Sequence, residues 1–284
     1  MSGRLESPEI ALRDVSVGYG ERTVLSGVRT VLPGGRISVI LGGSGCGKST
    51  LLRNIIGLVP IQSGRIVLGG RDMAAMDAAE QLAMRRRMGG LLQDGALLGS
   101  LRLGENIALP LREHTDLSDS LIEEVVRLKL RLVGLADFLD YFPSELSGGM
   151  RKRAGLARAM ALDPAVLLCD EPTSGLDPVT AADMDQLVLE LKATFDMTIV
   201  VVTHDLASLY AIADHVVVLR DGRMLFEGPL AALADCDEPF IRRFLGRMPS
   251  RESKVLPGTW VELVAGRRRG LAGGIAQGGP DAVG

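Results

Sequence analysis

The stretch Gly42-Gly43-Ser44-Gly45-Cys46-Gly47-Lys48-Ser49-Thr50 decides the fold of this chain. Its spacing, a glycine followed after four residues by Gly-Lys-Ser, is that of a phosphate-binding loop. The apolar residues 37–41 before it are typical of a buried strand, and residues 51–56 after it are typical of the first turns of a helix. Glycines at such a junction let several backbone N–H groups turn toward one point, where the helix N-terminus adds partial positive charge. A glycine-rich turn with a chance lysine would not be expected to lie between such a strand and such a helix. We therefore expect a nucleotide phosphate site here.

Two side chains of this loop have expected roles. Lys48 is placed to reach the β- and γ-phosphates, and the Ser49 hydroxyl is placed to ligate Mg²⁺. Unrelated ATPases, GTPases and kinases share such loops, so the rest of the chain has to indicate the class.

The composition is typical of a globular protein outside the membrane. The chain has 284 residues, of which 46% are hydrophobic and 24% charged, and its net charge of −3 gives no support to a nucleic-acid partner. No apolar run approaches the roughly 18 residues that span a bilayer, and the N-terminus lacks an apolar signal core, so we expect a cytoplasmic location. Three scattered cysteines, Cys46, Cys169 and Cys236, argue against a disulfide framework and a cysteine-based zinc site.

The N-terminal part predicts a β-hairpin with an aromatic residue near its tip. Residues 10–17 and 22–31 have strand character and are joined by the turn residues 18–21. Tyr19 in this turn is either a solvent-facing tyrosine or a ring that stacks on a purine base. Its position before the phosphate loop favours stacking.

The segment after the loop helix predicts an edge strand, a helix and a second strand. These elements cover residues 63–70, 75–87 and 88–93, and the arginines at 85–87 are expected at the solvated end of the helix. The strand ends in Gln93, whose amide can contact Mg²⁺ or its waters and sense the γ-phosphate. Alternatively, Gln93 only marks the end of the strand.

Residues 94–160 or thereabouts predict a helical subdomain inserted into an alternating strand and helix pattern. We expect a short helix near residues 105–108, stopped by Pro110, and a second over residues 121–133. The second helix shows apolar spacing at Leu121, Val125, Leu128 and Leu132. Its neighbour, residues 151–162, begins after Ser147-Gly148-Gly149, which is either an ordinary N-cap or a second anion-binding helix start.

Polar side chains end two strands of the expected parallel sheet. Residues 166–171 form an apolar run ending in Asp170 and Glu171, an acid suited to Mg²⁺ and a candidate to orient or deprotonate a water. The alternative, a surface pair of carboxylates, does not account for the ordered turn 172–177 that follows. After a helix at 178–195 and a strand at 197–203 comes His204, either a structural residue or, as its place at the carboxyl edge favours, a γ-phosphate contact.

The C-terminal part predicts a hairpin and two short helices, followed by a change of composition. The hairpin joins residues 216–219 and 223–227, and the helices cover residues 229–233 and 238–245. From about residue 246 the chain is rich in glycine and arginine. It is either a disordered extension or, at residues 255–264 around Trp260, a segment that packs on a partner.

Taken together, these motifs resemble the ATP-binding cassette ATPases of ABC transporters over residues 8–245. Gly42–Thr50 is similar to Walker A, Gln93 to the Q-loop, and Tyr19 to the adenine-stacking aromatic residue. Residues 146–150 resemble the signature motif, with Met150 where glutamine is commonest, and residues 166–171 resemble Walker B with its catalytic glutamate. Residues 174–177, ending in Asp177, look like the D-loop, and His204 looks like the switch histidine.

The resemblance implies an α/β fold, that of a P-loop NTPase cassette with a mainly parallel central sheet, an antiparallel β subdomain and an inserted helical subdomain, before a C-terminal extension at 246–284. It implies ATP and Mg²⁺, with Glu171, His204 and Lys48 as catalytic residues and Ser49, Gln93 and Asp170 toward the metal. It also implies a head-to-tail dimer, with ATP between Walker A of one cassette and Ser147, Gly148 and Gly149 of the other. The partner cassette is a second copy or a homologue. A membrane-spanning permease is expected to dock after Gln93.

Several short segments further resemble the Mla/Mce-type lipid transport ATPases: residues 93–97, 105–108, 110–114, 146–153 and 239–245. This implies phospholipid or another hydrophobic lipid as cargo, an Mce-type substrate-binding protein and an accessory subunit, no nucleic acid, and a peripheral location on the cytoplasmic face of the inner membrane. The same engine with another cargo is one alternative. A soluble cassette ATPase acting on DNA or ribosomes is another, disfavoured by the single cassette and by about a hundred residues between Walker A and the signature without heptads. The sequence identifies neither the cargo nor the transport direction.

Overall fold

A six-stranded sheet forms the centre of the computed structural model, which describes residues 7–246 of the chain. The strand order is β10-β9-β3-β8-β7-β6, and every neighbouring pair is parallel except β9 with β10. The bounds are β3 Ile37–Gly42, β6 Met88–Leu91, β7 Val166–Asp170, β8 Thr198–Thr203, β9 His215–Arg220 and β10 Arg223–Pro229. The predicted α/β fold with a mainly parallel central sheet is confirmed.

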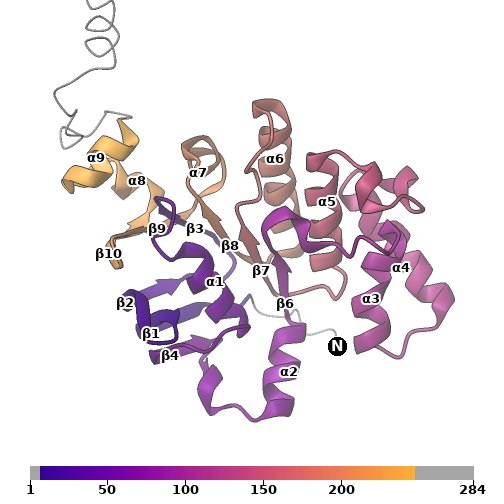
Figure 1. Ribbon diagram of the computed structural model, residues 1–284, viewed down its shortest axis with the longest axis horizontal. Coiled ribbons are helices and arrows are strands. Elements are labelled where there is room, and N and C mark those ends of the chain that lie inside the picture. Colours follow the sequence, from indigo (N-terminus) through magenta and orange to yellow (C-terminus); the bar gives the residue numbers. More distant parts are fainter. Residues whose placement is uncertain (1–6, 247–284) are drawn as a thin grey trace, which may run out of the picture. The chain divides into compact units, whose positions relative to one another are not determined.

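Burial explains why these apolar runs are strands. All residues of β3, β7 and β8 are buried, as expected for central parallel strands covered on both faces. Helix α1 (Lys48–Ile56) buries Leu51, Leu52 and Ile55 in one core with Val166, Leu168 and Val200 of the sheet. Because the phosphate loop joins β3 to α1, this packing fixes the loop at the carboxyl edge of the sheet (Figure 1).

A second, antiparallel sheet has the order β2-β1-β4-β5. Its bounds are β1 Ile10–Tyr19, β2 Arg22–Leu32, β4 Ser63–Leu68 and β5 Arg71–Asp72. The predicted hairpin is confirmed, with Ile10 opposite Leu32 and Tyr19 opposite Arg22. The prediction that residues 63–70 form an edge strand was wrong, because β4 lies between β1 and β5. Gly69 and Gly70 both take positive φ, and this turn adds the two-residue β5 outside β4.

The described residues between β6 and β7 contain helices and turns but no strand. Helix α3 contacts both α4 and α5, and the three lie together at one end of the sheet (Figure 1). The bounds are η2 Gln93–Ala96, α3 Leu103–His114, α4 Asp119–Leu132, η3 Ala136–Phe138, η4 Pro143–Glu145 and α5 Gly148–Ala159.

The prediction that Pro110 stops a short helix was wrong, since α3 continues to His114 with Pro110 inside it. Proline has no N–H for the carbonyl of Asn106, four residues before it. The helix persists because Leu103, Ile107 and Leu111 are buried on one face, on both sides of the proline. Tertiary packing therefore outweighs the local preference to end the helix.

Helix α4 is confirmed, but its buried face is not the predicted apolar stripe. Ile122, Val126 and Leu130 are buried, whereas Leu121 and Leu128 are 47% and 46% exposed. The predicted and the buried apolar faces are offset by one or two residues along the same helix, so spacing alone does not indicate which is buried. Packing of α4 against α3 and α5 decides it.

Most of the remaining elements follow the predictions, but the helix at residues 206–212 was not predicted. Helix α2 begins later than expected, after the short helix η1, and the helix predicted at 178–195 is confirmed as α6. The bounds are η1 Met73–Ala75, α2 Ala78–Arg86, α6 Pro178–Phe195, α7 Leu206–Ile212, α8 Leu230–Leu233 and α9 Pro239–Leu245.

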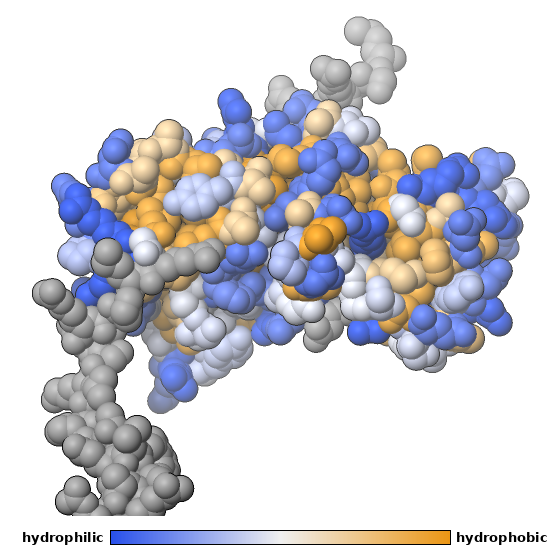
Figure 2. All heavy atoms as spheres, turned by 90° about the horizontal axis from the view of Figure 1, so that it is seen from above, coloured by the Kyte–Doolittle hydropathy of each residue, from blue (hydrophilic) through white to orange (hydrophobic). Residues whose placement is uncertain are grey.

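Within residues 7–246, no helix combines the length and apolarity needed to cross a bilayer. Hydrophobic residues on the face shown in Figure 2 form separate groups among hydrophilic ones. The segment predicted around Trp260 lies outside the described residues.

Candidate active site

Three glycines of the phosphate loop lie where a side chain would be strained or would clash. Gly45 and Gly47 have φ of 76° and 101°, in the left-handed region. A Cβ on Gly42 would lie 2.4 Å from the carbonyl oxygen of Leu219, and one on Gly47 would lie 2.7 Å from Cγ of Leu25. The loop leads into α1, whose N-terminus has no side-chain cap and no acidic residue in its first turn. The first N–H groups of α1 are therefore suited to bind an anion.

Lys48 lies over this loop and is only 6% exposed. Its Nζ donates hydrogen bonds to the carbonyl oxygens of Gly42 at 2.9 Å and Gly43 at 3.0 Å. The same Nζ lies 3.8 Å from Oε1 of Glu171. The predicted phosphate-binding cation is thus held between the loop and the carboxylate at the end of β7.

Ser49 and Asp170, predicted from distant stretches of sequence, lie in contact. The Ser49 hydroxyl donates to Oδ1 of Asp170 at 2.8 Å. Asp170 is 1% exposed, and its Oδ2 is buried without a hydrogen-bond partner in the described structure. Burial raises the pKa of Asp170, although the Ser49 hydrogen bond opposes that shift. A hydroxyl beside an unpaired carboxylate oxygen is a donor set that fits Mg²⁺, a cation that prefers oxygen ligands.

Glu171 follows β7 with an unusual backbone. Its φ is 53°, in the left-handed region that few residues other than glycine adopt. A carboxylate oxygen of Glu171 lies 2.9 Å from Nδ1 of His204, at the end of the neighbouring strand β8. The two residues predicted to act at the γ-phosphate are therefore hydrogen-bonded to each other.

The aromatic tip of the first hairpin lies beside the phosphate loop. The Tyr19 hydroxyl and Oγ1 of Thr50 are 3.1 Å apart, and Tyr19 is 52% exposed. A hollow of about 300 Å³ separates the hairpin from the loop and is lined by Tyr19, Arg22, Val24, Gly45, Gly47, Lys48, Ser49 and Thr50. An exposed ring at the mouth of this hollow is available to stack on a base.

Among residues 7–246, no hydrogen bond joins the side chains of the remaining predicted site residues to the phosphate loop. Ser147 caps α5 by accepting a hydrogen bond from the N–H of Met150 at 3.3 Å, as the N-cap interpretation predicts. Asp177 caps α6, and the hydrogen bond from the Thr180 hydroxyl is the main cause of its lowered pKa. Gln93 is exposed at the start of η2, and no hydrogen bond joins its side chain to Ser49 or Asp170 among residues 7–246.

Comparison with known proteins identifies the family. A family model described as ABC transporter matches residues 25–174. The chain belongs to the ABC transporter family and is an ABC ATPase. The solved cassette MJ0796, described as a dimer in a post-hydrolysis state bound to ADP and Pi, is 30% identical with a TM-score of 0.71. That match covers 78% of this chain and 98% of the other.

Two curated relatives of this ABC ATPase carry transport names. The probable ribonucleotide transport ATP-binding protein mkl of Mycobacterium tuberculosis (strain ATCC 25618 / H37Rv) is 44% identical over 236 residues. The match covers 83% of this chain and 66% of mkl, so this chain spans just under two thirds of that relative. The intermembrane phospholipid transport system ATP-binding protein MlaF of Escherichia coli (strain K12) is 41% identical over 236 residues, covering 83% of this chain and 88% of MlaF.

Two residues near the site of the cassette were not predicted by the sequence analysis. Arg22 lines the hollow directly opposite Tyr19 in the hairpin register, a position that the predicted turn could have indicated. Lys152 donates to the backbone of Glu171, 19 residues away. No local sequence pattern signals that contact, because it depends on how α5 packs beside the end of β7.

Proposed function

We propose that this ABC ATPase powers a bacterial transporter that moves phospholipid or another hydrophobic lipid across or between envelope membranes. The observation that carries the catalytic part is the pairing of Ser49 with Asp170, whose second oxygen is unpaired, close to Lys48 and Glu171. The name of MlaF supports the cargo. The name of mkl supports the alternative, the same engine serving another cargo.

In the proposed mechanism, Tyr19 stacks on adenine and the loop holds the phosphates of ATP. Lys48 exchanges its carbonyl partners for β- and γ-phosphate oxygens. Ser49 and Asp170, assisted by Gln93, would hold Mg²⁺, which when bound would supply positive charge to neutralise the two phosphates. Glu171 accepts a proton from a water that adds to the γ-phosphorus as the bond to ADP breaks. His204 holds the Glu171 carboxylate and contacts the departing phosphate.

The site is completed by a second cassette in this proposal. Ser147, Gly148 and Gly149 lie at the start of a 12-residue helix whose dipole suits a phosphate. Gly149 packs so closely on Thr180 of α6 that a Cβ would lie 2.7 Å from the threonine methyl carbon. The description of MJ0796 as a dimer supports an arrangement in which this helix start and Asp177 face the ATP of the partner.

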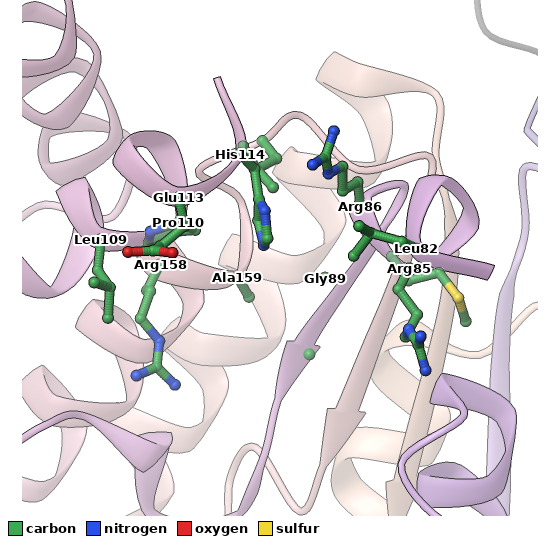
Figure 3. Close-up of a pocket in the computed structure, with 13 residues that line it drawn as sticks. Leu82, Arg85, Arg86, Gly89, Leu109, Pro110, Glu113, His114, Arg158 and Ala159 are labelled. Carbon is green, nitrogen blue, oxygen red and sulfur yellow. The ribbon is translucent and has the colours of Figure 1, made fainter. Parts of the chain in front are cut away.

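A cleft of about 480 Å³ between α2, β6, α3 and α5 is the proposed docking site of the permease (Figure 3). Leu82, Arg85 and Arg86 line one side, Leu109 and Glu113 line the other, and His114 lies between them. An apolar floor with charged residues at its edge suits an amphipathic segment. Docking here would place the protein peripherally on the cytoplasmic face of the inner membrane. An Mce-type protein and an accessory subunit complete the proposed complex.

The test is affinity purification of the tagged protein from detergent-solubilised membranes, with identification of co-purifying proteins and lipids. We expect a permease, an Mce-type protein and bound phospholipid. Recovery of a permease with a different binding protein would support the role as a transport ATPase but indicate a different cargo. Recovery of only ribosomes or DNA-associated proteins would overturn the transport proposal while leaving the ATPase chemistry in place.

A further inference from the structure

Lys152 is a buried cation directed at the backbone of the catalytic turn. It lies on α5, five residues after Ser147, and is 5% exposed. Its Nζ donates to the carbonyl oxygen of Glu171 at 3.0 Å, and to the carbonyl and hydroxyl oxygens of Ser174 at 2.5 and 2.9 Å. We propose that Lys152 is a positioning residue that sets the direction of the Glu171 carboxylate. This inference rests on the proposed role of Glu171.

The backbone of Glu171 needs such support because of its conformation. A left-handed φ at a residue other than glycine persists only when the surroundings hold it. The N–H of Glu171 donates to the carbonyl oxygen of Val202 at 2.9 Å, and the Ser174 hydroxyl donates to the carbonyl oxygen of Glu171 at 3.0 Å. Lys152 reaches both Glu171 and Ser174 from another element, so it fixes the turn relative to α5.

The consequence is a direct link between two parts of the proposed dimer site. The start of α5 carries Ser147, Gly148 and Gly149, which we propose to face the ATP of the partner cassette. The turn held by Lys152 carries Glu171, which acts on the ATP of its own cassette. A shift of α5 is therefore transmitted through one side chain to the carboxylate. Lys152 thus makes the rate of hydrolysis depend on the orientation of the helix that closes over the neighbouring ATP.

The test compares the Lys152→Met variant of the full chain, which keeps the length of the side chain but removes its hydrogen-bond donors, with wild type. We expect kcat to fall about 10- to 100-fold while KM and ATP affinity change less than about twofold, because displaced catalytic groups slow turnover without weakening substrate binding. Lys152→Gln, which retains a donor, should recover part of the loss. Arg153→Met is the matched control on the same helix, since Arg153 forms an ion pair with Asp183, 3.4 Å away, rather than contacting the turn.

A double variant separates positioning from a general loss of structure. If Lys152 acts through Glu171, adding Lys152→Met to Glu171→Gln should lower kcat little further, whereas independent damage would multiply the two losses. Wild-type kcat in both Lys152 variants, or multiplicative losses, would overturn the proposal. If Lys152→Met does not fold, the kcat of Lys152→Gln is measured instead, alone and combined with Glu171→Gln. Wild-type turnover of Glu171→Gln alone would instead remove Glu171 from catalysis, which is a failure of the proposed function.

Discussion

The two carboxylate oxygens of Asp170 have different environments, and that difference defines the proposed metal site. Oδ1 accepts the Ser49 hydroxyl, while Oδ2 is buried without a partner in the described structure. Burying a carboxylate that is not fully paired costs stability. Burial raises the pKa of Asp170 above its usual value. The Asp170 carboxyl group therefore binds its proton more tightly in the folded protein than in the unfolded chain.

Asp170→Asn should therefore make the nucleotide-free protein more stable at neutral pH, by on the order of 1 kcal/mol, while removing most Mg²⁺-dependent hydrolysis. In wild type, stability lost to the buried charge returns as the pH falls through the raised pKa, because the folded state then takes up the proton. The gain from the substitution should shrink over the same range. Urea denaturation at a series of pH values measures the free energy of unfolding of both proteins. A variant less stable than wild type at neutral pH would contradict the assignment of Asp170 as a buried, incompletely paired carboxylate.

Lys48→Ala should abolish productive ATP binding. Lys48 is the cation that the loop holds at its centre, through hydrogen bonds to Gly42 and Gly43. We expect at least a 100-fold loss of ATPase activity, as on the order of several kcal/mol of phosphate stabilisation is removed. Titration with a fluorescent ATP analogue checks the binding step. Normal ATPase activity in this variant would rule out the phosphate-loop assignment.

At the scale of elements, the sequence predicted the parts whose local pattern and chemistry agree. Strands β3, β7 and β8 are largely apolar runs. The sheet brings the phosphate loop after β3, the carboxylates at the end of β7 and the histidine after β8 to one edge. What could not be predicted depended on packing between elements. The buried face of α4, the continuation of α3 through Pro110 and the place of β4 inside its sheet all depend on neighbours distant in sequence.

Pro110→Ala tests whether packing holds α3 together against its proline. Alanine restores the N–H and has a higher helix propensity, so the free energy of unfolding should rise by about 1–2 kcal/mol after allowing for the more flexible unfolded chain. Pro178→Ala is the control, since Pro178 begins α6, where proline is favourable, and its replacement should bring no gain. Urea denaturation of the two variants is the measurement. A loss of stability in Pro110→Ala would contradict this account of α3.

Across the whole molecule, two separate surfaces are proposed to meet two different partners. The permease would occupy the cleft between α2, β6, α3 and α5, and the second cassette would meet the phosphate loop and the start of α5. Leu82→Glu in the cleft should reduce recovery of the permease at least tenfold while leaving ATPase activity of the purified protein unchanged, because a buried charge disrupts an apolar contact. Leu121→Glu is the matched control, because Leu121 lies on α4 outside the cleft and is 47% exposed, against 41% for Leu82. Equal recovery with both variants would remove the cleft as the docking site.

In the proposed mechanism, two copies of the chain enclose ATP and hydrolysis separates them. Glu171→Gln keeps the shape of the side chain but cannot accept the proton, so it should bind ATP and hydrolyse it slowly. The most direct measurement is the mass of this variant in solution by light scattering, with and without ATP and Mg²⁺. We expect the mass of one chain without nucleotide and of two chains with ATP and Mg²⁺. Adding Ser147→Arg should return the protein to one chain. A Glu171→Gln variant that binds ATP but stays a single chain, or one that dimerises equally well with Ser147→Arg, would contradict the proposed mechanism.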